Sequence, residues 1–267
     1  MNRALLAHTW RSQRLKLVVV CVGLAIWSAL LPIVYGTFGQ TFRSIIDSGL
    51  IPKQLMQFGG GDIFSLSGAL ALGAIHPISL ILNSIFAAGF ATSAVAGERQ
   101  RGTLEVLLAR PLSRQTVYVT LLVAVFGFVG IAVAASIVGA TVGAAIAGVA
   151  GELVPARLPL FWLNAVLLFG AIGSVGLAAS VTFDRLTPAI GLTVGFTVVS
   201  YFLEVLGSLW PDAQGLQRYS VFHYFDAKQV LEGNVEAGNL AILSAVGVAA
   251  IAWALAVFPR RDLAAPS

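Results

Sequence analysis

The sequence predicts an all-α integral membrane protein, and two observations lead to this prediction. Of its 267 residues, 58% are hydrophobic and only 10% are charged, whereas roughly 25% are charged in a typical soluble domain. The apolar residues also form long blocks instead of alternating with polar ones. So few charges cannot cover the surface of a water-soluble fold, and blocks of this length suit a lipid bilayer. We therefore expect residues 1–267 to form a single transmembrane domain.

Charge-poor segments predict six crossings, which would place both termini on the same side of the membrane. One charge-free stretch is too long for a single crossing at about 1.5 Å per residue. We therefore place a crossing after its natural break at His76-Pro77, with Phe64–Ile75 either near the outer surface or extending the same helix. The predicted crossings are Leu17–Tyr35, Pro77–Ala96, a part of Gln115–Gly151, Leu158–Phe183, Leu186–Leu203 continuing towards Trp210, and Ala237–Pro259.

The lysines and arginines predict the orientation. Of the 16, 11 lie in segments on the N-terminal side of the membrane and 5 lie on the other side. The positive-inside rule then places both termini in the cytoplasm, as expected for a multi-pass protein of the plasma (inner) membrane. The net charge of +4 does not indicate nucleic-acid binding, because the basic residues flank the apolar blocks and form no stripe with stacking aromatics.

Residues 1–16 are expected to form a short helix in the membrane interface before the first crossing. Arg3, Arg11 and Arg14 fall on one helical face, while Leu6 and Trp10 lie on the neighbouring face. A signal peptide is the alternative. The apolar run that follows is long, however, and no small-x-small cleavage site comes after it.

The segment between the second and third crossings, residues 97–115, carries the most specific pattern. Leu104, Leu107 and Leu108 stand at i, i+3 and i+4 and predict the apolar face of a short helix. Gly102 and Thr103 can open this helix, and Pro111 ends it. Ser113 can then cap the next crossing. A solvated loop whose charges only set topology is equally compatible with the residues. An apolar stripe within a charged rim is, however, typical of a docking surface.

The same residues form a signature. Glu98 is followed by Arg101-Gly102-Thr103-Leu104-Glu105 and then by Leu107-Leu108-Ala109-Arg110-Pro111-Leu112-Ser113-Arg114. This pattern resembles that of type-2 ABC exporter permeases, in which the segment is the coupling helix that seats in a cleft of the cytoplasmic ATPase subunit. The resemblance covers the whole chain and includes the closing Phe258-Pro259-Arg260-Arg261-Asp262. One departure is that Gln115–Tyr118 lacks the lysine often found there. The resemblance implies ATPase coupling by Glu98, Arg101, Gly102, Thr103, Leu104, Glu105, Leu107, Leu108, Pro111 and Arg114.

The chain contains no nucleotide-binding motif of its own. A phosphate-cradling loop requires G-x-x-x-x-G-K-[ST], and no glycine cluster here is followed by Lys-Ser or Lys-Thr. We therefore expect no catalytic residue, cofactor or metal in this chain, which would not itself be an enzyme. The resemblance implies that two copies of a separate ABC ATPase bind ATP and Mg²⁺. A second permease, identical or paralogous, would complete a membrane dimer.

Polar groups within the predicted crossings are scarce, and three of them are weak candidates for a substrate path: Asn83, Asn164 and Glu204. Glu204 lies about 27 Å from the inner end of its crossing at about 1.5 Å per residue, and hence near the outer interface. It is compatible with a group facing a cavity or with an interfacial acid reaching water. The asparagines are also compatible with interhelical hydrogen bonds. Aromatic residues after the fifth crossing fit either a headgroup belt or a re-entrant helix.

Small residues predict close helix contacts at Gly139-x-x-x-Gly143, at Gly191-x-x-x-Gly195, and at Gly170, Gly173 and Gly176. Other function classes fit less well than an exporter permease. An ion-coupled secondary transporter builds its site from buried carboxylates or broken helices near the midplane, where no charge is predicted here. An intramembrane enzyme would need a constellation of reactive groups at one depth, which the sequence does not offer. No residue in the sequence excludes a non-transporting membrane scaffold.

Overall fold

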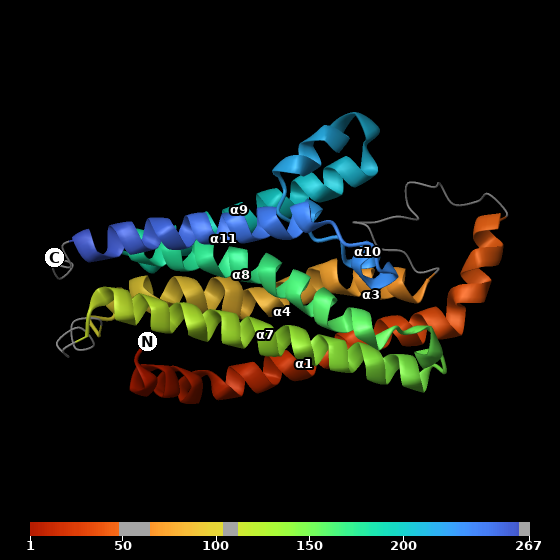
Figure 1. Ribbon diagram of the computed structural model, residues 1–267, viewed down its shortest axis with the longest axis horizontal. Coiled ribbons are helices and arrows are strands. Elements are labelled where there is room, and N and C mark those ends of the chain that lie inside the picture. Colours follow the sequence, from red (N-terminus) through yellow and green to blue (C-terminus); the bar gives the residue numbers. More distant parts are fainter. Residues whose placement is uncertain (48–64, 104–111, 262–267) are drawn as a thin grey trace.

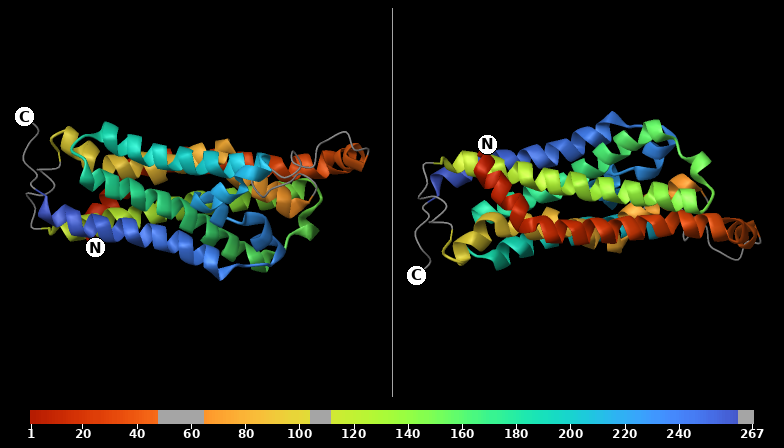
Figure 2. Two further views of the ribbon diagram at one scale, coloured as in Figure 1. Left: turned by 90° about the horizontal axis from the view of Figure 1, so that it is seen from above. Right: turned by 90° about the horizontal axis from the view of Figure 1, so that it is seen from below.

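A computed structural model of the chain describes residues 1–47, 65–103 and 112–261. Within these ranges the chain is helical and contains no strand. The long helices run roughly side by side along one axis and form an elongated bundle (Figures 1 and 2). The fold is therefore that of an all-α membrane protein.

Five helical segments are each long and apolar enough to cross a membrane: Arg3–Gly39, Arg114–Ile146, Pro155–Thr182, Leu186–Leu209 and Ala237–Arg260. Leu66–Ile75 and Pro77–Phe90 are bent by 49° relative to each other and together are long and apolar enough for a sixth crossing, as a broken span or a re-entrant loop. The α-helices are α1 (Arg3–Asp47), α3 (Leu66–Ile75), α4 (Pro77–Ser84), α5 (Glu98–Gln100), α7 (Arg114–Ile146), α8 (Leu158–Thr182), α9 (Leu186–Leu209), α10 (Ala227–Glu232) and α11 (Ala237–Val257). Five of the predicted crossings therefore correspond to long apolar helices, and the predicted second crossing falls on the bent pair.

The predicted break at His76-Pro77 is confirmed, and its cause is local. His76 has extended backbone angles, as expected before a proline, and Pro77 begins α4. Because Pro77 has no N–H, the carbonyl of Gly73 loses its normal helical partner. The Trp27 indole N–H donates to this carbonyl at 3.0 Å and the Ser79 hydroxyl donates to it at 2.6 Å. The bend thus leaves no orphaned backbone acceptor at this position in the bundle.

Residues 1–16 do not form a separate helix, because they are the first part of α1. The beginning of α1 bends away from the rest of the helix (Figure 2), and its backbone stays helical throughout. Trp10 packs on Phe128 of α7 with ring centroids 4.6 Å apart, and the Asn2 N–H donates to Thr120 at 2.8 Å. Packing against α7 therefore extends the first crossing into the predicted interfacial segment. Its position in the membrane interface stays a prediction.

Two of the predicted small-residue contacts hold the bundle together. A Cβ atom on Gly139 would lie 2.1 Å from the Ala25 carbonyl oxygen, and one on Gly143 would lie 2.2 Å from that of Ala29. Helices α1 and α7 can approach so closely only because these positions are glycine. Gly170, Gly173 and Gly176 of α8 likewise face neighbouring helices. Gly191 and Gly195 meet no atom within 4 Å in the described part of the chain, so their contact stays a prediction.

Candidate functional site

The beginning of α1 and the end of α11 lie at the same end of the bundle, together with the turn between α8 and α9 and the beginning of α7 (Figure 1). We call this end the inner end, after the predicted topology. It carries the predicted ATPase-coupling segment, residues 97–115. The structure describes both ends of that segment, at 97–103 and 112–115.

Gly102 ends the helix of the second crossing. Its φ of +72° is left-handed, which glycine adopts without a Cβ penalty. The Gly102 N–H donates to the Arg99 carbonyl and the Thr103 N–H donates to the Glu98 carbonyl, both at 3.0 Å. These two bonds form a Schellman motif, which satisfies carbonyls that a helix end leaves without partners. The sequence prediction that Gly102 opens the next helix is therefore incomplete, because Gly102 first closes the preceding one.

The Glu98 side chain closes the same turn. Its carboxylate forms an ion pair with Arg101 and accepts a hydrogen bond from the Thr103 hydroxyl at 2.5 Å. The Thr103 hydroxyl lies 3.1 Å from the Glu98 carbonyl as well. The structure thus brings together four of the predicted coupling residues, Glu98, Arg101, Gly102 and Thr103, in one compact turn. The predicted Leu104, Glu105, Leu107, Leu108 and Pro111 lie outside the described residues.

A second set of contacts attaches this turn to the turn between α8 and α9. Asp184 Oδ1 lies 2.5 Å from Arg99 Nη1 and 2.5 Å from Arg261 Nη2. The Gln100 side-chain oxygen accepts the Leu186 N–H at 3.0 Å, at the start of α9. Arg261 also donates to the Val181 carbonyl at 2.9 Å. One aspartate therefore joins the second crossing, the α8–α9 turn and the end of α11.

Arg114, another predicted coupling residue, anchors the C-terminal end of α11. Its Nη1 donates to the carbonyls of Phe258, Pro259 and Arg261 at 3.2, 3.3 and 2.5 Å. Arg114 begins α7, where the predicted cap by Ser113 is confirmed, since the Ser113 hydroxyl accepts the Thr116 N–H at 3.1 Å. We refer to Arg99, Gln100, Arg114, Asp184 and Arg261 as the inner-end network.

Sequence reasoning missed most of the inner-end network. Arg99 and Arg261 entered the argument only as topological charges, and Asp184 did not enter it. The available signal was an acidic residue in a very short turn on the side where basic residues accumulate. Such a carboxylate has only arginines as neighbours and therefore pairs with them.

The three candidates for a substrate path do not come together. Asn83 donates to the Ser79 carbonyl of its own helix at 2.9 Å. Asn164, at the outer part of α8, lines a small polar pocket together with Asp226, Asn234 and Asn239. Among the described residues, no hydrogen bond or shared pocket joins Asn83, Asn164 and Glu204.

Glu204 belongs to a hairpin at the far end of the bundle, formed by the end of α9 and the 3-10 helices Pro211–Tyr219 and Phe222–Tyr224. We call residues 204–224 the outer hairpin. Gln217 donates to the Glu204 carboxylate at 3.0 Å and to its carbonyl at 3.1 Å. His223 Nδ1 lies 3.9 Å from the other carboxylate oxygen. The aromatic-rich segment thus folds back along the end of α9, as a re-entrant arrangement requires.

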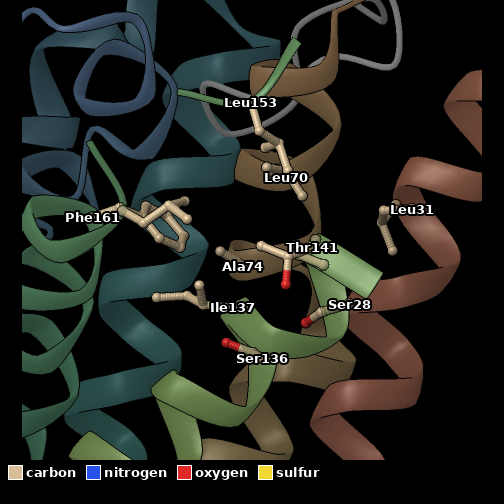
Figure 3. Close-up of a pocket in the computed structure, with 12 residues that line it drawn as sticks. Ser28, Leu31, Leu70, Ala74, Ser136, Ile137, Thr141, Leu153 and Phe161 are labelled. Carbon is tan, nitrogen blue, oxygen red and sulfur yellow. The ribbon is translucent and has the colours of Figure 1, made fainter. Parts of the chain in front are cut away.

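A separate pocket lies between α1, α3, α7 and α8 (Figure 3). Its interior volume is about 20 Å³, which is room for a water-sized molecule. Ser28, Ser136 and Thr141 contribute hydroxyl groups to its lining, and most of the remaining lining residues are apolar, among them Leu31, Leu70, Leu153 and Phe161. The lining contains no charged side chain, so the pocket favours uncharged groups.

The family model described as "Multidrug efflux system permease Rv1217c, C-terminal domain" matches residues 3–259. The chain belongs to this family. Its five to six helices long enough to cross a membrane, and the absence of strands from the described ranges, agree with a multi-pass efflux permease. A search of curated proteins finds no match. Among the described residues, no group of three or more His, Cys, Asp and Glu side chains is arranged to hold a metal ion.

Proposed function

We propose that this efflux permease is the membrane subunit of an ATP-driven exporter of the type-2 ABC kind. The observation that carries the proposal is the attachment of the 97–103 turn to the α8–α9 turn and to the end of α11. A segment that only sets topology has no need of such anchors. A segment that transmits force must be held firmly to the helices that it moves.

The contacts suggest how force would pass into the membrane. Closure of an ATPase pair would push on residues 97–115. Arg99 and Gln100 would transfer the displacement to Asp184 and Leu186, and hence to α8 and α9. Arg114 and Arg261 would carry the end of α11 with them. Charge-assisted hydrogen bonds are short and directional, so they suit a joint that must move as one body.

The complex that we propose contains two copies of a cytoplasmic ABC ATPase, which bind ATP and Mg²⁺, and a second permease that is identical or paralogous. Large apolar side chains are exposed on α1, α9 and α11, among them Ile26, Val198, Phe202, Val248 and Trp253. In a bilayer these faces meet lipid or a second permease. The complex would lie in the plasma (inner) membrane with both termini in the cytoplasm.

The family description names multidrug efflux for the permease on which it is based. We propose that this chain also exports apolar or amphiphilic molecules. The lining of the pocket in Figure 3 supports this chemical class, because it consists of hydroxyl groups and apolar side chains without any charge. The pocket would have to widen to admit such a molecule, since its interior volume is about 20 Å³.

The docking role of the coupling segment is tested by the double substitution Leu107→Ser and Leu108→Ser. A fully buried leucine contributes about 1.5–3 kcal/mol relative to exposure, and a loss of about 3 kcal/mol weakens binding over a hundredfold, since 1.4 kcal/mol is tenfold. We expect the variant to insert normally but to lose co-purification with its co-expressed ATPase and substrate-stimulated ATP hydrolysis. Leu209→Ser with Leu216→Ser is the matched control, because both leucines are exposed near the outer hairpin. Full co-purification and normal transport by the first variant would refute the coupling role.

Two measurements separate this proposal from its alternatives. The purified chain should hydrolyse no ATP above background, and transport should require the ATPase subunit. Transport that persists without the ATPase and collapses with an ionophore would instead indicate a secondary transporter. The absence of transport of any tested drug, with intact assembly, would favour a scaffold.

The orientation is tested by fusing a reporter that works only in the cytoplasm. It should be active after Asp262 and inactive at Gly60 or Gly233. Activity at Gly233 would show that the topology is wrong.

A further inference from the structure

The helix that leads into the coupling segment contains two wide turns. Ile85–Phe90 and Ser93–Gly97 are π-helical, while the rest of the span from Pro77 to Gln100 is α-helical. A π-helical turn holds more residues than an α-helical one, and such turns are frequent at functional sites. The second of them ends directly before Glu98, where the coupling segment begins.

A hydroxyl group from another helix is inserted into this second wide turn. Ser180 of α8 accepts the Ala96 N–H at 2.9 Å and the Val95 N–H at 3.0 Å, and it donates to the Thr92 carbonyl at 2.7 Å. In a regular α-helix the Ala96 N–H would donate to the Thr92 carbonyl directly. The Ser180 hydroxyl therefore stands between the two partners of one helical bond. Insertion of a side chain into the helical ladder is a recognised cause of helix distortion.

The surface of α8 is shaped to receive the wide turns. Gly173 and Gly176 lie seven and four residues before Ser180, on the same helical face. A Cβ atom on Gly176 would lie 3.0 Å from that of Ala91 and 3.1 Å from the Ala87 carbonyl oxygen. The second crossing can thus approach α8 closely enough for the Ser180 hydroxyl, which is fully buried, to reach its backbone.

We propose that Ser180 is a positioning residue of the coupling segment: by holding the wide turn at 93–97, its hydroxyl fixes the direction in which Glu98–Thr103 leaves the bundle. Reversion of the wide turn to α-helix would shift the register by one residue. Everything beyond it would rotate by about 100° and move by about 1.5 Å. Arg99 would then leave Asp184, now 2.5 Å away, and Gln100 would leave the Leu186 N–H. The consequence for transport rests on the proposed function, whereas the fixed direction of the segment does not.

The chain offers a matched pair of substitutions. Ser180→Ala removes the inserted hydroxyl. Ser174→Ala removes an equally buried hydroxyl from the same helix, but Ser174 donates to the Gly170 carbonyl of its own helix at 2.8 Å. Ser180→Thr keeps a hydroxyl at position 180. Any effect specific to the inserted hydroxyl should appear in Ser180→Ala, be absent from Ser174→Ala and be reversed in Ser180→Thr.

The first two measurements need no ATPase. In the purified chain in lipid nanodiscs, amide hydrogen exchange at residues 93–97 should be at least tenfold faster in Ser180→Ala and within twofold of normal in Ser174→Ala. Spin labels at the exposed positions Arg101 and Gln115, in a Cys21→Ala background that removes the single cysteine, should report a shifted or broadened distance distribution for Ser180→Ala alone. Unchanged exchange or an unchanged distance distribution in Ser180→Ala would overturn the inference.

The third measurement joins the inference to transport. With the ATPase reconstituted, the amount of substrate moved per ATP should fall at least fivefold in Ser180→Ala and stay normal in the other two variants. A normal ratio, despite faster exchange and a changed distance, would overturn the consequence for transport, whereas the role of Ser180 in fixing the direction of the segment would stand on the first two measurements. If the unsubstituted chain couples to no ATPase, the proposed function is wrong. The exchange and distance measurements would still decide whether Ser180 directs the segment.

Discussion

The inner end and the outer hairpin both place polar side chains at helix ends, but they join very different parts of the chain. At the inner end Asp184, Arg114 and Gln100 bond groups that are 77 to 147 residues away in the sequence. In the outer hairpin Gln217 bonds Glu204 and Ser208, which are 13 and 9 residues away. The inner end thus ties separate crossings into one unit, whereas the outer hairpin is bonded mainly to itself. This difference fits the proposed mechanism, in which force enters the bundle at the inner end.

The largest effect is expected from Asp184→Asn. The change removes the negative partner of Arg99 and Arg261 and leaves the Arg99 side chain, which is 11% exposed, without its ion pair. We expect the free energy of unfolding to fall by about 1–3 kcal/mol, the range for a buried polar group that loses its partner. Thermal unfolding in detergent measures this loss. Asp212→Asn, at an exposed position of the outer hairpin, is the control and should change stability by less than about 0.5 kcal/mol. If both variants lose the same free energy of unfolding, the contrast between the inner end and the outer hairpin is wrong.

Arg114→Ala should have the next largest effect. It removes a guanidinium that bonds three carbonyls at the end of α11. These bonds are exposed or only partly buried, so water can replace part of what is lost. We expect amide exchange near the end of α11 to accelerate at least tenfold, together with weaker coupling to the ATPase. Arg218→Ala is the control, because Arg218 lies over the ring of its neighbour Tyr219 at 4.9 Å. If the amides at the end of α11 exchange at the normal rate in Arg114→Ala, Arg114 does not hold that end in place.

Gln217→Ala should act more weakly and only locally. It breaks the bonds to Glu204 and Ser208, so we expect a loss of about 0.5–1.5 kcal/mol, seen as faster amide exchange confined to residues 204–224. Gln214→Ala, three residues earlier at an exposed position, should leave exchange unchanged. Faster exchange at the inner end in Gln217→Ala would show that the outer hairpin is not independent of it.

The smallest effect is expected from Asp226→Asn, just beyond the outer hairpin. Burial raises the pKa of Asp226, and the nearby Glu236 and Glu232 raise it further, while bonding to Gln229 and the proximity of His223 oppose this. A carboxyl whose folded-state pKa is raised stabilises the fold fully below its unfolded pKa, and this contribution is lost as the pH rises through the folded pKa. Asparagine can still cap α10, so the variant should be slightly more stable than the normal chain at pH 7. This gain, measured by amide exchange in α10, should shrink as the pH falls towards the ordinary carboxyl range; a gain independent of pH would contradict the assignment.

Much of the fold was predictable because its signals are local. The ends of α8 and α9 lie within one residue of a predicted boundary at Leu158, Phe183 and Leu186, since hydropathy and flanking charge determine where a helix can cross lipid. The break at His76-Pro77 and the cap at Ser113 also follow from single residues. The beginning of α1 was not predictable in this way, because the contact of Trp10 with Phe128 joins positions far apart in the sequence.

The candidate site, too, could be predicted from the sequence only in part. The sequence located the coupling segment, through its leucine spacing and its resemblance to a family signature, and it named Glu98, Arg101 and Thr103. It did not indicate that Arg99 and Gln100 attach the segment to the α8–α9 turn. Nor did it indicate that Ser180 enters the helix before the segment. The sequence around a serine in an apolar crossing does not indicate which group its hydroxyl bonds. The hydroxyl can equally well bond its own helix, as that of Ser174 does.

By itself, the sequence determined that the chain is a multi-pass helical membrane protein and where most of its long apolar helices lie. Those properties depend on the transfer of apolar side chains into lipid and on the backbone limits of proline, which act within a few residues. Only the tertiary structure decided which polar groups meet at the inner end and that the second crossing reaches it through wide turns. The wide turn, for example, depends on Gly176, which lets α8 approach the second crossing closely enough for Ser180 to bond its backbone. In a medium without water, each polar group must find its partner on whichever helix that packing brings near.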